Sequence, residues 1–216
     1  MMEDRPKKLV DFCRTCSDGL SDLEDNEARI RFVTSIFEPL ISDRELFRKI
    51  LENVVQGRPY PDVRYPTMFD NELILHLDPA GHFSLRMFLW PPGKFDSIHD
   101  HNSWGVIGPI SGRLKVRNFM RLHGNAPGEP TGVVETGRRI VIAGMSYHVL
   151  PLDEGIHQTG NPTDATVVQI SVYGKKQTDR SYINIFDEES GRIYPLYSPP
   201  LRKRLLAENA LEGLEL

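Results

Sequence analysis

One stretch near the middle of the chain contains the strongest signal for both fold and site: Pro92-Gly93-Lys94-Phe95-Asp96-Ser97-Ile98-His99-Asp100-His101. In a β-strand, side chains two positions apart point to the same side, so His99 and His101 share one face and Asp100 takes the other. Two imidazoles this close disfavour each other's protonation, and a divalent metal ion is a usual reason to hold them together. His157 lies far enough along the chain to arrive from another strand, so we expect a metal site built from His99, His101 and His157.

The sequence around this stretch is typical of a protein made of short strands. From residue 69 to 190, short apolar runs alternate with turns rich in Gly, Pro, Asn and Asp. Helices do not alternate with these runs, which argues against a parallel βαβ sheet, and short strands with close turns predict a sandwich or barrel. The expected strands are Glu72–Leu77, Ser84–Trp90, Asp96–His101, Trp104–Ser111, Leu114–Leu122, Val133–Thr136, Met145–Pro151, His157–Gly160, Thr166–Gly174 and Tyr182–Asp187.

The two ends of the chain have a different texture. Residues 1–57 place apolar residues at spacings of three and four, which predicts helices over Pro6–Ser17, Asn26–Glu38 and Asp43–Val55. Pro39 is expected to end or kink the second helix. Residues 198–216 form a polar tail, expected to be helical from Leu201. We therefore predict one domain over 1–216, with a helical layer at 1–57 and a β-barrel at 69–190.

Composition excludes several classes of function. The chain has 216 residues and a formal net charge of −4, whereas a general nucleic-acid binder presents a basic surface. Apolar runs long enough to cross a bilayer are absent, and the first residues lack the apolar segment of a secretory signal. We expect a cytoplasmic protein that binds neither nucleic acid nor membrane, as a monomer or a small homo-oligomer.

Cys13 and Cys16 are the two cysteines of the chain. Their C-x-x-C spacing suits a redox pair or half of a metal site. However, they fall in a predicted helix, and a second such motif is missing. We therefore interpret them as small apolar residues of the helical layer.

The histidine stretch belongs to a longer pattern that resembles the two sequence motifs of the cupin superfamily. That resemblance implies a double-stranded β-helix, or jelly-roll barrel, whose histidines bind a metal ion. Most cupins place a glutamate ligand a few residues after the first two histidines, but Trp104, Gly105 and Val106 occupy that stretch here. The pattern reads Gly93-x5-His99-x-His101-x10-Gly112, then Gly144, then Pro151-x3-Gly155-x-His157-x3-Asn161.

The missing glutamate points to one branch of that superfamily. The run from Pro92 to Gly108 is similar to bacterial members of the type I cysteine dioxygenase family, which are thiol dioxygenases. The resemblance implies Fe(II) on three histidines, with a small thiol such as cysteine or 3-mercaptopropionate and O₂ as partners, and a sulfinate as product. Three histidines left open on one side suit Fe(II), although they also accept Zn or Ni.

A second stretch both matches and departs from that family. Its members have a Ser-x-His-x-Tyr strand beside the iron, with the tyrosine hydroxyl facing the substrate. Tyr173 and Gly174 match, but Gln169 stands in place of the serine and Ser171 in place of the histidine. We expect Tyr173 to be catalytic, and Gln169 and Ser171 to line the cavity with a different hydrogen-bond network.

Further residues are candidates for binding the substrate. Glu72 lies near the position of the family's carboxylate-binding residue, where a carboxylate favours an amine instead. Arg86 and Arg180 can each bind an anion in a bidentate way, or lie on the surface. Trp104 and His148 are expected to line the cavity or to pack in the core.

Two alternatives to a thiol dioxygenase stay open. One is a related cupin metalloenzyme that acts on a non-thiol small molecule as an oxygenase, isomerase or lyase, which Gln169, Ser171 and Glu72 favour. The other is a non-catalytic cupin sensor, because a fold alone does not determine function. The sequence contains no basic recognition helix as an output for such a sensor.

Overall fold

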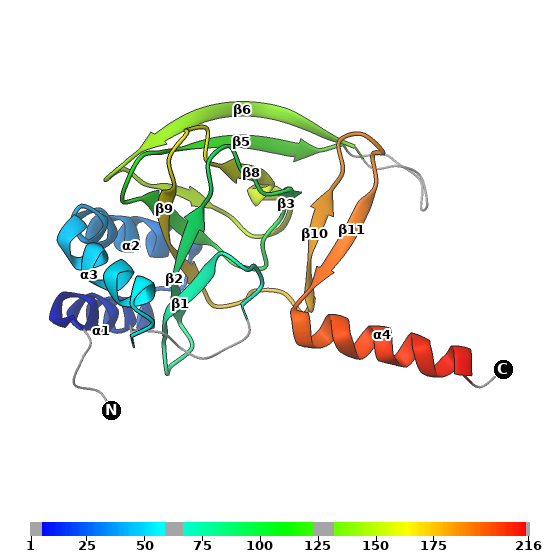
Figure 1. Cartoon of the computed structure of the whole chain (residues 1–216), viewed down its shortest axis with the longest axis horizontal. Helices are drawn as coiled ribbons and strands as arrows, with labels where there is room; N and C mark the ends of the chain where they lie inside the picture. The colour runs from blue at the N-terminus through cyan, green and yellow to red at the C-terminus, as the bar shows by residue number, and fades with distance from the viewer. Residues whose placement is uncertain (1–5, 59–66, 123–131, 215–216) are drawn as a thin grey trace.

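A computed structural model describes residues 6–58, 67–122, 132–214 of the chain (Figure 1). Three helices come first, eleven strands and a short 3₁₀ helix follow, and one helix ends the described chain. The elements are α1 (Lys7–Ser21), α2 (Asn26–Ile41), α3 (Arg44–Val55), β1 (Glu72–Leu77), β2 (Phe83–Trp90), β3 (Ile98–His99), β4 (Gly105–Pro109), β5 (Arg113–Arg121), β6 (Val133–Ile142), β7 (Tyr147–Val149), η1 (Leu152–Gly155), β8 (His157–Gly160), β9 (Val167–Gly174), β10 (Tyr182–Phe186), β11 (Ile193–Tyr197) and α4 (Pro199–Leu214).

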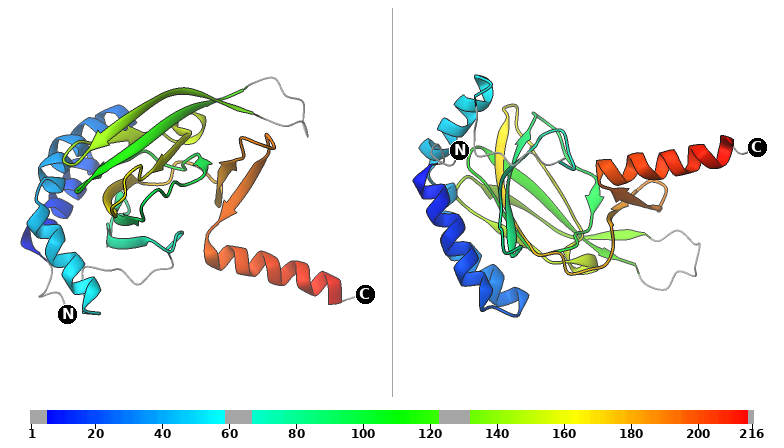
Figure 2. Two further views of the ribbon diagram at one scale, coloured as in Figure 1. Left: turned by 45° about the horizontal axis from the view of Figure 1, so that its top comes forward. Right: turned by 90° about the horizontal axis from the view of Figure 1, so that it is seen from below.

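The strands form two antiparallel sheets, in the orders β1-β2-β9-β4-β7 and β11-β10-β3-β8-β5-β6. The sheets lie opposite each other as a barrel, and α1, α2 and α3 cover the outer face of the first sheet (Figures 1 and 2). This arrangement confirms the expected fold class, a mainly β, cupin-type barrel with an N-terminal helical layer.

Strand β9 shows how the sequence separates the two faces of the first sheet. Val168, Ile170 and Val172 are buried in one core cluster with the helical layer, which includes Phe37 and Phe47. The residues between them point the other way, into the barrel, because side chains alternate along a strand. The inward row is Gln169, Ser171 and Tyr173.

Side-chain caps explain where two of the helices begin. Asp25 accepts a hydrogen bond of 2.7 Å from the amide of Ala28 at the start of α2, and Asp43 accepts one of 3.1 Å from Leu46 at the start of α3. Of the two expectations for Pro39, that it ends or kinks α2, the first is wrong. The helix continues to Ile41, because Leu40 and Ile41 are buried in the core and hold the last turn in place.

The expected strands are present, with differences at their ends. The expected strand over residues 133–136 continues to Ile142, and β11 had no strand prediction. Both are edge strands with many exposed side chains, so they lack the alternating pattern that marks a half-buried strand. The expected strand over residues 96–101 shortens to β3, since only Ile98 and His99 pair with neighbouring strands.

Two further expectations concern the ends of the chain. Cys13 and Cys16 are both buried in α1 within the helical core, as expected for small apolar residues. The tail is helical as predicted and begins at Pro199, and α4 extends away from the barrel (Figures 1 and 2). Among the helices in the described ranges, none has the length and apolar character that a membrane crossing requires.

Candidate metal centre

The three predicted histidines come together inside the barrel. His99 ends β3, His157 begins β8, and these two residues face each other across the antiparallel pair. His101 follows two residues after His99, and one ligand atom from each histidine lies within 4.8 Å of the others. The ring centroids are 4.7 to 4.9 Å apart. Within the described ranges, no carboxylate joins this group.

Hydrogen bonds to the backbone orient two of the rings. Nδ1 of His99 lies 2.9 Å from the carbonyl oxygen of Ser97, and Nδ1 of His157 lies 3.0 Å from that of Gly155. A carbonyl oxygen only accepts, so Nδ1 bears the proton in both rings and Nε2 has a lone pair for a metal. Nε2 of His101 is buried and has no hydrogen-bond partner among the described residues. The donor set therefore fits a divalent metal ion.

Burial keeps the rings of His101 and His157 neutral. It lowers the pKa of His157 from 6.5 to about 3, and the neighbouring His99 adds to the effect. Burial, together with His99 and His157, holds the pKa of His101 well below its ordinary value. Neutral imidazoles are the form that binds metal ions, so these two histidines are ready to coordinate at neutral pH.

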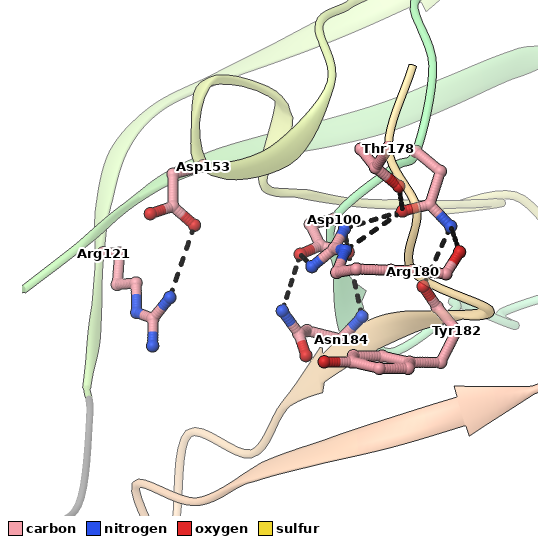
Figure 3. A network of polar contacts seen from close by, with 8 residues as sticks. Asp100, Arg121, Asp153, Thr178, Arg180, Tyr182 and Asn184 are labelled. Atoms are coloured by element: carbon pink, nitrogen blue, oxygen red, sulfur yellow. Dashed lines mark hydrogen bonds and ion pairs between the residues drawn. The ribbon is translucent and has the colours of Figure 1, made fainter. Parts of the chain in front are cut away.

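Asp100, between His99 and His101 in the sequence, holds this segment through a polar network with Arg180 and Asn184 (Figure 3). Its fully buried carboxylate accepts hydrogen bonds of 2.8 and 3.1 Å from the guanidinium of Arg180, and 2.8 Å bonds from the amide and side chain of Asn184. Arg180 also donates to Asn102. The expectation that Arg180 binds substrate is therefore corrected, because its guanidinium is held by Asp100 on the far side of the strand.

Tyr173 lies beside the cluster, with its ring stacked on His101 at a centroid distance of 5.6 Å. Burial raises the pKa of its hydroxyl well above the ordinary value, although a hydrogen bond with Ser171 acts in the opposite direction. Tyr173 therefore remains protonated and can donate a hydrogen bond.

A hydrogen-bonded row leads from Tyr173 along the inner face of the sheet. The indole N–H of Trp90 donates to Oε1 of Gln169 at 2.9 Å, and Nε2 of Gln169 donates to Oγ of Ser171 at 3.0 Å. An indole nitrogen only donates, so it determines which way the Gln169 amide points. Ser171 Oγ thus accepts from Gln169 and lies at the Tyr173 end of this row.

Arg86 points into the barrel, as its alternation along β2 predicts. It pairs with Ser171 in register, donates to Oγ of Ser84 at 3.0 Å, and forms an ion pair with Glu72. The buried Glu72 carboxylate also accepts from the amide of Met68 at 2.8 Å. The expectation that Glu72 attracts an amine is corrected, because Arg86 already balances its charge.

Trp104 and His148 lie outside the cavity. Trp104 is 1% exposed and packs against Gly174 in the core shared with the helical layer. His148 is exposed on the outer face of β7, where it lines a surface groove together with Glu27 and Arg31 of α2. Trp104 therefore packs in the core, which is one of its two expected places, whereas the expectation for His148 is corrected, because its side chain neither lines the site nor packs in the core.

The structure adds residues that the sequence did not single out. Asp96 lies 3.6 Å from Nδ1 of His99 and accepts a 2.6 Å hydrogen bond from the amide of Thr159, and burial raises its pKa to about 7. The ring of Tyr147 meets that of His157 edge-on at 6.2 Å, and its hydroxyl lies 2.7 Å from that of Thr159. The alternation of side chains along β2 could have placed Trp90 on the inner face of the sheet. Asp96 lies in irregular backbone, where no alternation indicates the direction of a side chain.

No family profile matches the chain. Solved structures that resemble it include a Cupin_2 domain of an XRE family transcriptional regulator from Enterobacter cloacae, with 16% identity, coverage of 48% of this chain and 93% of that chain, and a TM-score of 0.35. A Cupin 2 conserved barrel domain protein from Salinispora arenicola has 19% identity, coverage of 51% and 82%, and a TM-score of 0.37. An oxalate oxidase has 15% identity, coverage of 53% and 54%, and a TM-score of 0.35.

The chemistry of the site follows from its own side chains. Three histidines converge inside a cupin-type barrel, with a protonated tyrosine stacked on one of them. Such a group can hold a metal ion and leave coordination positions open, as metalloenzymes require. The chain thus has a three-histidine candidate metal site with a hydrogen-bond donor beside it.

Proposed function

We propose that the protein is a mononuclear non-haem iron thiol dioxygenase, which joins both atoms of O₂ to a small thiol (R–SH + O₂ → R–SO₂H). The observation that supports this proposal is the combination of three converging histidines with Tyr173 stacked on His101. The buried, unpartnered Nε2 of His101 fits a bound metal ion. Fe(II) held by these histidines would supply the redox chemistry and favour ionisation of a thiol beside it.

Tyr173 is the residue that we propose touches the substrate. The row from Trp90 through Gln169 to Ser171 ends beside Tyr173, whose protonated hydroxyl can donate to the reacting group. In this row, Gln169 stands where the resembled family has a serine, and Ser171 stands where that family has a histidine. Each donor in this row meets an acceptor, from Trp90 to Gln169 and from Gln169 to Ser171. The polar groups beside Tyr173 are therefore held in place before substrate arrives.

We further propose that Arg86 binds the carboxylate of an acidic thiol. Its Nε and Nη1 atoms bond to Ser84 and Glu72, which leaves the Nη2 side of the guanidinium to face a ligand. Glu72 is then a positioning residue, since it holds Arg86 and does not attract an amine. This arrangement favours 3-mercaptopropionate or cysteine over cysteamine, which has no carboxylate.

The test is oxygen uptake by the Fe(II)-reconstituted protein with cysteine, 3-mercaptopropionate, cysteamine and mercaptosuccinate. The expected result is uptake equimolar with the sulfinate formed, largest for a thiol acid. Tyr173→Phe is expected to lower kcat by roughly 10-fold to 100-fold at unchanged iron content, because it removes one positioned donor. Trp90→Phe is expected to lower kcat less, and to add little in a Gln169→Leu background.

A second candidate is a cupin metalloenzyme that acts on a non-thiol substrate. The smaller Ser171 at the position of a family histidine favours it, because the side chain leaves room for a larger ligand. Uptake no greater than that of the metal-free control with every thiol would contradict the dioxygenase proposal and support this candidate.

A further inference from the structure

The inner face of the hairpin formed by β10 and β11 lies directly beside the metal ligands (Figure 1). Ile185 faces His99 across the pair of β10 and β3, and Tyr194 faces Ile185 across the pair of β10 and β11. Residues that face each other in antiparallel strands point to the same side of the sheet. Because His99 points into the barrel, Ile185 and Tyr194 point inward as well. Two positions further along, Ile183 and Leu196 also face each other on this side, and we call these four apolar residues the hairpin wall.

The two faces of the hairpin are packed differently. On the outer face, Phe186 is 3% exposed and lies with Ile193 in a hydrophobic cluster. The residues of the hairpin wall belong to none of the hydrophobic clusters in the described part of the chain. Tyr194 is 45% exposed, and the other three are half-buried. An apolar surface that stays uncovered beside a few converging polar groups is typical of a ligand pocket.

Hydrogen bonds fix the hairpin wall relative to the metal ligands. Asn184 lies between two wall residues on β10, and both its amide and its side chain donate 2.8 Å bonds to Asp100 (Figure 3). The amide of Asp100 donates in return to the carbonyl oxygen of Asn184 at 3.1 Å. Since Asp100 stands between two of the ligands in the sequence, these bonds hold the wall at a constant place beside a bound ion.

The position of the hairpin wall favours a small molecule as its occupant. The wall continues directly from the ligands, so a molecule bound at the metal reaches it from the site itself. Addition of a strand from another protein is disfavoured, because β11 is the edge strand and its central residue is Pro195. A proline has no amide hydrogen to donate to an incoming strand.

We infer that the hairpin wall binds an apolar substituent of the substrate, so that the substrate class is a thiol acid with an aliphatic or aromatic side group. The inference rests on the proposed function, in which the sulfur lies at the metal and the carboxylate lies at Arg86. The wall has one aromatic ring and no charged group. It therefore favours an apolar group over the amino group of cysteine, which would lose its hydration there.

The experiment measures the binding of 3-mercaptopropionate and of 2-benzyl-3-mercaptopropionate to the zinc-loaded protein by isothermal titration calorimetry. Zinc is redox-inert, so binding is measured apart from oxidation. The benzyl derivative is expected to bind about 10-fold more tightly, because its ring buries apolar surface against the hairpin wall. Tyr194→Ser and Ile185→Ser are each expected to lower this ratio of Kd values to about 2, since each removes part of the wall.

Ile140→Ser is the matched control. Ile140 is 51% exposed on β6, an edge strand of the same sheet, and points outward because the next residue, Val141, is buried inside the barrel. This variant is expected to keep the wild-type ratio. Zinc content and thermal unfolding check that each variant folds and holds the ion.

Two results would overturn the inference. One is equal affinity of the wild-type protein for the two thiol acids, and the other is a loss of the ratio in Ile140→Ser as large as in the wall variants. Oxygen uptake by the Fe(II)-reconstituted protein is measured separately. Tighter binding of the benzyl derivative without any uptake would support the hairpin wall and contradict the dioxygenase proposal.

Discussion

His101 and His157 are neutral because of where their rings lie. His101 and His157 are enclosed by the barrel and by each other, and a proton on either one would be a buried charge without a counter-ion. A metal ion removes this conflict, because it uses the lone pairs that burial keeps free of protons. The same burial makes both metal content and stability sensitive to single substitutions.

Replacement of His101 by alanine removes the ligand atom that is buried without a partner among the described residues. We expect bound metal to fall from about one ion per chain to near zero, since two histidines hold a divalent ion poorly. Metal analysis after dialysis measures this. His148→Ala is the matched control, because His148 is exposed on the outer face, and equal loss of metal in both variants would contradict the assignment.

The depressed pKa of His157 predicts how the metal-free protein responds to acid. The folded value is about 3 and the ordinary value is 6.5, so between these values the unfolded chain binds the extra proton. Stability is therefore present above pH 6.5 and is lost as the pH falls, by about 2 kcal/mol from pH 7 to 5 for one such histidine. Urea unfolding of chelator-treated protein at the two pH values measures the loss. In His157→Asn the loss is expected to be smaller by that amount, and an unchanged loss would contradict the argument.

At the scale of elements, β3 is too short to hold its histidines by backbone pairing alone. The network of Asp100 with Arg180 and Asn184 substitutes for the missing ladder, and it joins the histidine strand to β10 (Figure 3). An interaction outside the cavity thus determines the position of the ligands inside it.

Asp100→Asn is expected to lower the free energy of unfolding by about 2 kcal/mol, because it leaves Arg180 without a partner charge. The effect is smaller than for a fully buried pair, since the Arg180 side chain is 21% exposed. Chemical unfolding measures it. Asp153→Asn is the control, because the 3.6 Å pair of Asp153 with Arg121 is more exposed. A loss of stability in this variant as large as in Asp100→Asn would contradict the claim that the Asp100 pair stabilises the fold more.

The directions of side chains could be predicted from the sequence where they follow the two-residue period of a β-strand. The alternation of β2 and β9 correctly placed Arg86, Gln169, Ser171 and Tyr173 on the inner face, and the spacing of His99 and His101 placed both on one side. Pairings between distant side chains have no local signature. The partnerships of Arg180 with Asp100 and of Glu72 with Arg86 follow from packing, so the sequence could not identify them.

Two of the three hydrophobic clusters in the described part of the chain lie on opposite faces of one sheet. The helical layer and the outer residues of β2, β4 and β9 form the larger cluster, while Leu114, Val116 and Tyr147 belong to the one inside the barrel. The metal ligands come from β3, its following residues and β8, which lie in the second sheet. A bound ion therefore links segments far apart in the sequence and adds to the stability of the complete fold.

Metal removal is accordingly expected to lower the melting temperature. With metal at about 100 times its Kd the gain is about 2.7 kcal/mol, which corresponds to roughly 5–10 °C for a chain of this size. Differential scanning calorimetry before and after chelation measures the shift. His101→Ala is expected to show none, and a shift of equal size in that variant would place the stabilising ion elsewhere.

The two faces of β9 also have a consequence for how this protein can change over evolutionary time. Val168, Ile170 and Val172 anchor the strand to the helices, whereas Gln169, Ser171 and Tyr173 meet only the interior. Mutations on the inner row can alter what the pocket accepts while the anchoring row keeps the strand in register. A barrel built this way separates the residues that face its interior from those that hold the strand on the helices, so the two rows can change independently of each other.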